Sequence, residues 1–569
     1  MTDRRLGETM KRKLRSNFEP GTSRWAVRRA QWRALGLSDE DMEKPKIAVV
    51  NSSSELSICF SHLDGVAKVV KDAIRSAGGL PFEIRTMAVS DFITSAGRAG
   101  TFLLPSRDLI TNDIEVQVQG AQLDGMVCLS SCDKTPPGHL MAAARTNIPT
   151  ISVLCGYQRS GEYRGHHVDI EEVFLGAGHH AAGALSFDDL KGMADNAIRG
   201  PGVCAGMGTA NSMHSVVEAL GMSLPGGAPV AANSPKMFDY AKRAGERIVE
   251  MVWEDLRPRT ILTKGAFLNA AALVLAVSGS INCIKHLQAI AEEAGVDVDV
   301  HQLFDELADR IPILSAVMPI GKNTIEQFDD AGGARGVMKQ LEPMLDASAM
   351  TVTGKTVVDN LAGVEVADPE VIRPLSRPFA TKPGIVILRG NLAPDGAIVK
   401  IGLRGEGRPL KFRGPAKVFE NSPEAEAALK AGKIKKGDAV ILRGQGVCGG
   451  PGMGGASRLV FQIDGAGLGA YVAVITDGQL SGLVNKGLVL GEVAPESATG
   501  GPLALVEDGD TITIDVEDRS VNLEVPEEEI TVRRARFQAP PFKDDSGWLS
   551  IYRRTVQPLA KGAVLLRGN

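Results

Sequence analysis

The chain has 569 residues, of which 44% are hydrophobic and 23% are charged, and its formal net charge is −5 at pH 7. This composition is typical of a globular protein, and the length predicts two or three domains. The weakly acidic balance excludes a basic surface of the kind that binds nucleic acid, so we expect no nucleic-acid partner.

Signals for export or membrane insertion are weak. The N-terminal segment MTDRRLGETMKRKLRSN is basic, but no apolar segment follows it as in a secretory signal. The most apolar stretch, residues 266–284, is interrupted by Asn269, Ser278 and Asn282 and predicts one buried helix rather than a membrane span. Seven cysteines are too few for a disulfide scaffold in a chain of this length. We therefore predict a cytoplasmic enzyme with free or metal-bound thiols and no membrane partner.

Apolar, strand-like runs alternate with amphipathic helical patterns in the first two-thirds of the chain. The strand-like runs are residues 46–53, 123–133 and 149–156, and helical patterns cover residues 62–79 and 138–147. This alternation predicts βαβ units and a parallel sheet. In such sheets ligands bind at the carboxyl ends of the strands, so polar residues that follow a strand are the candidates for function.

The character of the sequence changes at residues 366–384, which contain four prolines and read as a domain boundary. One helical pattern, at residues 422–432, interrupts a region that is otherwise rich in strands. Its strand-like segments are residues 384–390, 396–403, 437–444, 471–478 and 510–525. We therefore predict an α/β domain with a parallel sheet over residues 1–375 and a β-barrel-like domain over residues 376–569.

Three cysteines stand in loops beside predicted strands or helices. Cys59 follows the first strand-like run, Cys132 follows the second, and Cys204 lies in the glycine-rich segment GPGVCAGMGTANSM. Three thiolates could hold an iron–sulfur cluster with one iron left open, but their spacing of about 70 residues matches no local cluster motif. Zinc suits the same residue types, so the spacing leaves both metals open. Cysteines inside apolar runs are instead read as small core residues: Cys128, Cys155 and Cys283.

A thiol, a carboxylate and an amine adjoin in the segment SSCDKTPPG, residues 130–138. Asp133 of this segment and Asp91 of VSDFITSAG carry oxygen ligands that suit Mg²⁺, although a single aspartate there is also typical of a helix cap. Lys134 could be a solvated surface lysine, but a cation is unusual at the start of a helix. Ser481, in TDGQLSG, has no adjacent His or Asp, so the sequence does not predict a hydrolase triad.

Several motifs together resemble one enzyme family. In chain order they are SSCDKTPPG, CAGMGTANSM, TVTGKT, RGPAKVFENSPEA, GGPGM and TDGQLSG. They are similar in content and order to motifs of the dihydroxy-acid and 6-phosphogluconate dehydratase family, which also contains sugar-acid dehydratases. The resemblance implies a hydro-lyase that forms a homodimer or a homotetramer and acts on a small hydroxy acid.

The resemblance also implies cofactors. Cys59, Cys132 and Cys204 would ligate an iron–sulfur cluster, with 2Fe–2S favoured over 4Fe–4S, and one open iron would accept the 3-hydroxyl group of the substrate. Asp91 and Asp133 would bind Mg²⁺, and Lys134 would join them where it is carbamylated.

Ser481 would be the base that removes the C2 proton of the substrate. Mg²⁺ would then stabilise the developing enolate, and the enol would tautomerise to a 2-keto acid.

The sequence departs from the family pattern at several of these motifs. The usual Pro-Glu after GGPGM is Gly454-Gly455, which removes a glutamate ligand of Mg²⁺, and the usual arginine of the serine motif is Gln479. Ile58 and Phe60 replace the usual neighbours of Cys59, and Val484 replaces a threonine. Because Mg²⁺ readily keeps water ligands, we expect an active enzyme with weakened Mg²⁺ affinity.

We therefore expect a dehydratase that converts a 2,3-dihydroxy carboxylate to a 2-keto-3-deoxy acid. The altered motifs surround the substrate and favour sugar acids over other small dihydroxy acids. The first alternative is the dihydroxy-acid dehydratase of branched-chain amino-acid biosynthesis, which acts on 2,3-dihydroxy-3-methylbutanoate. The second is a non-catalytic iron–sulfur redox or sensor protein, which Gly455 would explain through loss of the Mg²⁺ site.

Overall fold

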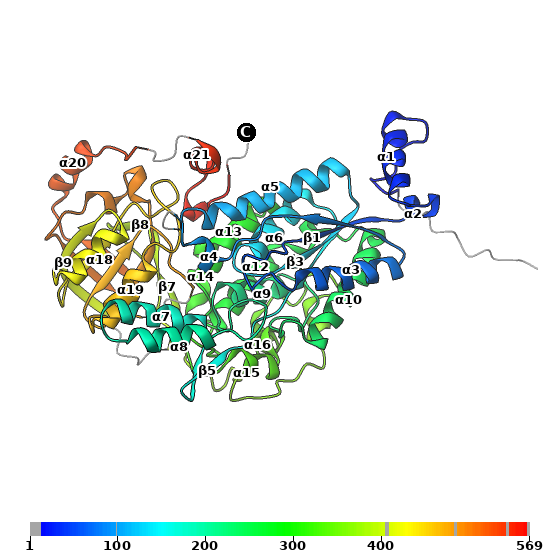
Figure 1. Ribbon diagram of the computed structural model, residues 1–569. Helices are drawn as coiled ribbons and strands as arrows, with labels where there is room; N and C mark the ends of the chain where they lie inside the picture. Colours follow the sequence, from blue (N-terminus) through cyan, green and yellow to red (C-terminus); the bar gives the residue numbers. More distant parts are fainter. Residues whose placement is uncertain (1–12, 98–99, 404–408, 483–485, 542–545, 566–569) are drawn as a thin grey trace, which may run out of the picture.

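The computed structural model describes residues 13–97, 100–403, 409–482, 486–541 and 546–565. An α/β part and a β-barrel lie side by side, with the barrel made by the C-terminal third of the chain (Figure 1). This arrangement confirms the predicted fold class of an α/β region with a parallel sheet followed by a barrel-like region. No described helix is long and apolar enough to cross a membrane.

A parallel four-stranded sheet organises the N-terminal part in the order β2-β1-β3-β4. The strands are β1 (Lys46–Asn51), β2 (Leu80–Arg85), β3 (Gly125–Ser130) and β4 (Thr150–Leu154). Every residue of β1, β3 and β4 is buried, as expected for a parallel sheet that helices cover on both faces. The strands therefore read as continuous apolar runs, which is why the sequence pattern located them.

Helices of the N-terminal part cover this sheet. The helix α3 (Leu63–Ser76) buries Leu63, Val66, Ala67 and Val70, whose helical spacing forms one apolar stripe. The other helices that contact the sheet or its covering layer are α5 (Leu103–Ala121), α6 (Thr135–Thr146), α9 (Thr209–Ala219), α10 (Pro235–Glu254) and α13 (Asn282–Ala294).

The apolar stretch at residues 266–284 was expected to be one buried helix, and this was wrong. It contains the end of α12 (Lys264–Ala276) and the start of α13, separated by residues 277–281. Ser278 adopts a left-handed φ of 45°, and the N–H of Ser280 donates to Ser212 Oγ at 2.9 Å. This polar contact with α9 stabilises the break between the helices.

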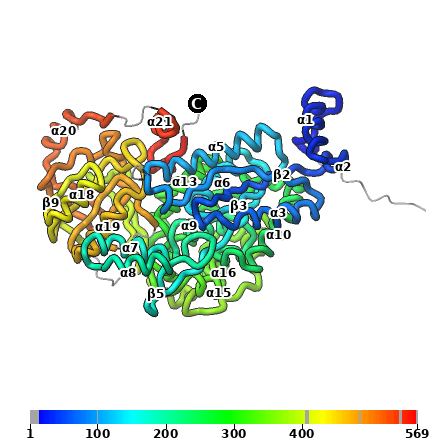
Figure 2. The backbone as a smooth tube through the Cα atoms, in the orientation of Figure 1, coloured from blue at the N-terminus to red at the C-terminus, as the bar shows by residue number. Residues whose placement is uncertain are grey.

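The remaining helices lie mainly in the layers around these elements. Two short strands, β5 (Gly161–Tyr163) and β6 (His166–Val168), form a small antiparallel pair. The helices are α1 (Ser23–Ala34), α2 (Asp39–Glu43), α4 (Asp91–Thr94), α7 (Ile170–Ala181), α8 (Phe187–Asn196), α11 (Pro258–Ile261), α14 (Val300–Ala308), α15 (Ile325–Asp330), α16 (Gly333–Leu341) and α17 (Val357–Leu361). The α1 segment projects at one end of the molecule (Figure 2), where the ring of Trp32 stacks on Phe82 of β2, and none of its residues is buried.

The described strands of the C-terminal part close into a barrel in the order β10-β11-β12-β8-β7-β14-β13-β9. They are β7 (Ile385–Gly390), β8 (Ala393–Lys400), β9 (Lys411–Phe419), β10 (Ala439–Leu442), β11 (Ala473–Thr476), β12 (Leu488–Ala494), β13 (Thr511–Asp515) and β14 (Ser520–Leu523). Alternate residues such as Ile512 and Ile514 of β13 are buried in an apolar cluster of their own.

Helices flank the barrel and join it to the α/β part. They are α18 (Ser422–Lys430), α19 (Ser457–Gly465), α20 (Glu527–Arg536) and α21 (Gly547–Thr555). Helix α7 packs against α19, where the rings of Phe174 and Phe461 meet edge to face with centroids 4.9 Å apart. The two parts therefore share an apolar contact next to the site described below.

Candidate active site

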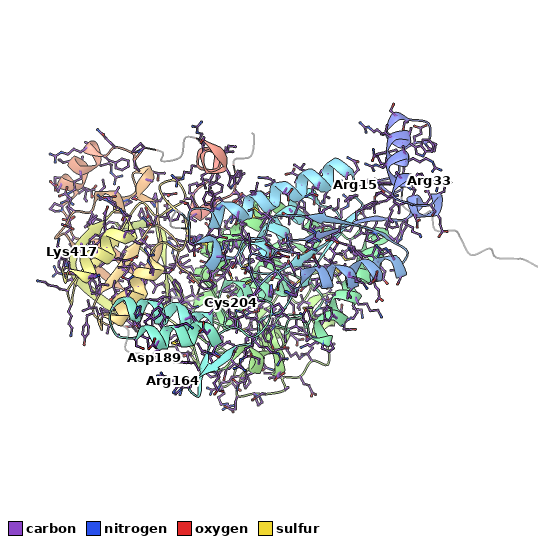
Figure 3. The ribbon with its side chains drawn as sticks, viewed as in Figure 1. Arg15, Arg33, Arg164, Asp189, Cys204 and Lys417 are labelled. Atoms are coloured by element: carbon purple, nitrogen blue, oxygen red, sulfur yellow. The ribbon has the colours of Figure 1, made fainter. Side chains whose placement is uncertain are left out.

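One pocket gathers the residues that the sequence singled out. Its lining comes from the segments that follow β1, β2 and β3, from the start of α5, from α7, and from the glycine-rich segment that leads into α9. In the barrel part it comes from the start of α19 with the residues before it and from the loop after β11. Cys204 is half-buried and lies near the centre of the view in Figure 3, whereas Arg33 and Lys417 lie toward its opposite edges. The lining residues used below are Cys59, Asp91, Phe92, Leu103, Cys132, Asp133, Phe174, Cys204, Thr209, Met453, Gly454, Ser457 and Ser481.

The three predicted cysteines all line this pocket. The thiols of Cys59 and Cys132 are hydrogen-bonded, which lowers the pKa of Cys59 to about 7 and raises that of Cys132 well above its usual value. Because the two sulfurs share one proton, the pair forms a single thiolate readily and a second one reluctantly. Burial raises the pKa of Cys204 well above its usual value, and the charges of Cys59 and Asp133 add to this effect.

Cys132 is held in a strained backbone conformation. Its φ is 62°, in the left-handed region that residues with a side chain adopt rarely. The loops around it are tied together, since Ser131 Oγ donates to the carbonyl of Cys59 at 2.7 Å. Such strain is typical of functional sites, and here it accompanies a thiol that faces the pocket.

Lys134 is fully buried, so it is not the solvated lysine that was one interpretation of the sequence. Its Nζ lies 3.1 and 2.9 Å from the two carboxylate oxygens of Asp91 and 3.7 Å from Asp133 Oδ2. Burial alone would lower the pKa of Lys134, but the charges of Asp91 and Asp133 outweigh it and raise the pKa. Burial and the charge of Asp91 raise the pKa of Asp133 to about 7.

Ser481 reaches the pocket from the end of β11 in the barrel part. Its N–H donates to Ser457 Oγ at 2.8 Å, and the adjacent Gly482 also lines the pocket. A β-carbon at residue 482 would lie 2.4 Å from Ser280 Oγ and 2.6 Å from Thr209 Oγ1, so only glycine allows the segment to approach this closely. Val484, which departs from the family pattern, lies outside the described residues.

Thr209 is a site residue that sequence reasoning missed. Its hydroxyl hydrogen-bonds to Asp133 and is 2.9 Å from Ser280 Oγ. Asn282 Nδ2 donates to the same hydroxyl at 2.7 Å. Its place directly after the glycine-rich segment, as the first residue of α9, is the signal that could have identified it.

Part of the pocket lining is an apolar wall. Phe92, Leu103, Phe174 and Met453 line it, and the rings of Phe92 and Phe174 meet edge to face with centroids 5.6 Å apart. Sequence reasoning missed this wall because its members are scattered over four separate segments. Among the described lining residues there is no Arg, Lys or His.

Gly455 adjoins the pocket without lining it. A β-carbon at this residue would lie 2.6 Å from Oε1 of Gln445. The Gln445 carboxamide is held in place because Nε2 donates to the carbonyls of Glu420 and Arg443 at 3.2 and 3.1 Å. Gln445 therefore occupies space into which a longer side chain at residue 455 would have to grow.

No three His, Cys, Asp or Glu side chains in the described ranges are placed as they would be around a single metal ion. The three thiols nevertheless line the same pocket. Asp91, Asp133 and Lys134 form a second group beside them. This division into a sulfur group and an oxygen group fits two different kinds of inorganic cofactor.

The fold and this pocket define a two-part enzyme with its site between an α/β region and a barrel. The model of the dihydroxy-acid/6-phosphogluconate dehydratase N-terminal region matches residues 44–360, and that of the C-terminal region matches residues 370–563. The chain therefore belongs to this family of dehydratases, which are hydro-lyases, and both the family and the enzyme class expected from the sequence are confirmed.

Two relatives illustrate the similarity. A dihydroxy-acid dehydratase of Methanococcoides burtonii is 43% identical over 552 residues, which cover 96% of this chain and 99% of the relative. A dihydroxy-acid dehydratase of Moorella thermoacetica is 42% identical over 544 residues, which cover 95% of this chain and 98% of the relative.

Proposed function

We propose that this enzyme removes water from a short 2,3-dihydroxy carboxylate and releases a 2-keto acid. The observation that carries the proposal is the convergence of three thiols, two carboxylates and Ser481 on one pocket, with Lys134 directly behind it. The relatives named dihydroxy-acid dehydratase, aligned over nearly the full chain, support the same reaction.

The donor sets fit two cofactors. Cys59, Cys132 and Cys204 would hold an iron–sulfur cluster, because these three thiols line one pocket. We propose that this cluster is 2Fe–2S, as the resemblance to the family implies. Asp91 and Asp133 would hold Mg²⁺, together with Lys134 after carbamylation. When bound, these groups supply Lewis-acid stabilisation of the charge that develops on the substrate.

The chain's own residues would then handle protons and orientation. Ser481 would accept the C2 proton, since it lines the same pocket as the two carboxylates. Lys134 must lose its charge to become a metal ligand, because its ammonium now pairs with Asp91. Thr209 would orient Asp133 through their hydrogen bond.

The apolar wall indicates the far end of the substrate. Phe92, Leu103, Phe174 and Met453 suit a short aliphatic group, whereas a sugar acid would place hydroxyl groups against them. A phosphate group would find no described cation on the lining. We therefore propose an aliphatic 2,3-dihydroxy acid such as 2,3-dihydroxy-3-methylbutanoate, in place of the sugar acids that the altered motifs favoured.

The proposal can be tested with protein purified without oxygen. Production of 2-keto acid is measured with 2,3-dihydroxy-3-methylbutanoate, gluconate and 6-phosphogluconate, with Ser481→Ala as the inactive comparison. We expect turnover of the aliphatic acid only. Preference for gluconate would overturn the substrate assignment, and a coloured protein without turnover of any substrate would favour the sensor alternative.

The apolar wall gives a second test. Phe174→Ala should enlarge the pocket and raise kcat/KM for an acid with one or two more methylene groups relative to the five-carbon acid. The control is Phe187→Ala on the neighbouring helix α8, because this ring is exposed and does not line the pocket. Equal specificity in both variants would show that the wall does not contact the substrate.

We also propose that the chain divides into two domains near residue 375, that it acts in the cytoplasm, and that it forms a homodimer or homotetramer. The proline-rich segment before β7 supports the boundary. Light scattering coupled to gel filtration would test the oligomer, with a monomer as the contradicting result.

A further inference from the structure

A buried group of three polar side chains connects helix α13 to the segment that carries Ser481. Lys285, Glu492 and Gln479 are at most 4% exposed. They come from α13, from β12 and from the loop after β11. None of the three is needed for the acid–base and ligand roles proposed above, yet burying charge is costly.

The first connection joins Glu492 to the segment that leads to Ser481. Gln479 Nε2 donates to Glu492 Oε1, and the N–H of Glu492 donates to the carbonyl of Gly478 at 3.0 Å. Glu492 adopts a left-handed φ of 53° where the pairing of β12 with β8 shifts register. Such an irregularity redirects side chains, and here the carboxylate is directed to Gln479.

The second connection joins Gln479 to the pocket wall. The N–H of Gln479 donates to the carbonyl of Gly452 at 3.0 Å, and the N–H of Gly454 donates to the carbonyl of Gln479 at 2.7 Å. Gly454 and the nearby Met453 line the pocket, as does Ser481, two residues after Gln479. The position of Gln479 therefore determines where these lining residues stand.

The third connection is electrostatic. Lys285 is fully buried and its Nζ has no hydrogen-bond partner among the described residues. Burial lowers the pKa of Lys285 to about 7, and the strongest opposing influence is the charge of Glu492. His301 Nε2 also lies 3.9 Å from Glu492 Oε2.

Helix α13 reaches both sides of the pocket. Asn282, at its start, donates to Thr209, which holds Asp133 on the α/β side. Lys285 is three residues further along and so lies on the same helix face. One helix thus carries both Asn282, which contacts the support of the acidic group, and Lys285, on which the charge of Glu492 acts.

We propose that the hydrogen-bonded pair of Glu492 and Gln479 forms a brace that positions Ser481 against the pocket, and that the charge of Lys285 supports this pair, with Lys285 and Glu492 as positioning residues. The inference rests on the proposed role of Ser481. The buried charges hold the Gln479 amide, the amide fixes residues 478–482, and the serine hydroxyl is thereby kept at the distance from the substrate that proton removal needs.

The test uses the cofactor-loaded protein at pH 6.5, below the pKa of Lys285. Lys285→Met and Glu492→Gln are nearly isosteric changes that neutralise the brace. We expect each to lower kcat at least tenfold with less than a threefold change in KM, because substrate binding by the other lining residues is kept. The loss of kcat in the double variant should be about the same as in either single variant, because the two substitutions remove the same attraction.

A control and a second measurement separate positioning from stability. Lys46→Met removes another fully buried lysine, on β1 and away from the pocket, and should lower the melting temperature without lowering kcat. Hydrogen exchange of residues 476–482, measured without substrate, should accelerate in the two brace variants and not in Lys46→Met.

Unchanged exchange in the brace variants, or losses of kcat that multiply in the double variant, would overturn the inference. Exchange does not depend on turnover. A wild-type protein that is inactive on all substrates would therefore contradict the proposed function while leaving this inference testable.

Discussion

Cys132 combines a strained backbone with a thiol that is hydrogen-bonded to Cys59. A cysteine kept in a left-handed conformation costs about 1–3 kcal/mol, and such strain often accompanies a functional role. Its neighbour Cys128, two residues before the end of β3, has ordinary strand surroundings and is fully buried. The two thiols are four residues apart in sequence and differ completely in environment.

This contrast gives the first prediction. Cys132→Ser should lose most of the bound iron and of the visible absorbance of protein purified without oxygen, since serine is a poor ligand of iron–sulfur clusters. Cys128→Ala is the matched control and should keep both while losing some stability from the small cavity. Equal iron content in the two variants would contradict a cluster at Cys132.

Lys285 gives a prediction about pH. Its pKa is about 7 in the folded protein, against a usual value of 10.5. The unfolded chain therefore binds more protons between pH 7 and pH 10.5, so this lysine makes stability rise with pH in that window. The charged groups that act on it come from several elements and are Glu492, Lys134, Arg107 and Asp91.

Lys285→Met should therefore flatten the rise of the melting temperature between pH 7 and pH 9.5. The melting temperature of the variant should rise most relative to that of wild type near pH 7 and least near pH 9.5. The exposed Lys242→Met should leave the slope unchanged. A wild-type slope that persists in Lys285→Met would show that another group causes it.

The glycine-rich segment between β10 and α19 is the element that departs most from the family pattern. Gln445 lies where a side chain at residue 455 would begin. Gly455→Glu alone should cost about 1–3 kcal/mol of stability from overpacking, measured by chemical denaturation. It should not strengthen Mg²⁺ binding, because the new carboxylate is displaced.

Adding Gln445→Ala should make room for the glutamate. The double variant should then reach half-maximal activity at a lower Mg²⁺ concentration than wild type, whereas Gln445→Ala alone should not. An identical Mg²⁺ titration in all three proteins would show that residue 455 does not face the metal.

Elements with strong local patterns were predicted well from the sequence. The fully buried strands β1, β3 and β4 read as apolar runs, and the alternating segment at residues 510–525 became β13 and β14. The break between α12 and α13 was missed because its cause is the contact of Ser280 with Ser212, which is 68 residues away. The sequence of the apolar stretch itself does not indicate that Ser280 contacts Ser212.

The candidate site shows the same difference between residues in local motifs and residues whose roles depend on contacts with distant segments. Cys59, Asp91, Cys132, Asp133, Cys204 and Ser481 belong to recognisable motifs, and the structure brings all of them to one pocket. Phe174, Lys285 and Glu492 have ordinary neighbours in sequence. Their roles depend on pairings between segments, such as Gln479 with Glu492, that no single motif contains.

At the scale of the molecule, the site depends on how the α/β part meets the barrel. Gly178 of α7 lies against Phe461 of α19, and a β-carbon there would stand 2.6 Å from the Phe461 β-carbon and 2.8 Å from its backbone carbon. At Gly176, one half-turn away, a β-carbon would meet only flexible side-chain ends at 3.3 Å or more.

Gly178→Ala should therefore push α7 away from α19 and cost about 1–3 kcal/mol, with a loss of activity, because the pocket has walls from both parts. Gly176→Ala should be nearly neutral or stabilising by up to about 1 kcal/mol, since alanine favours a helix. Denaturant unfolding and kcat/KM measure both effects. Equal behaviour of the two variants would show that this junction does not support the site.

The division of the pocket between distant segments also sets an order of events during synthesis. All three cysteines have left the ribosome once residue 204 has emerged, whereas Met453 and Ser481 follow roughly 250 residues later. At about 5–20 residues per second, this interval lasts on the order of 10–50 s. During that time the three cysteines have already emerged from the ribosome, but the barrel segments that later line the pocket beside them have not. The cell therefore has a period in which iron and sulfide can reach these cysteines without passing through the finished pocket.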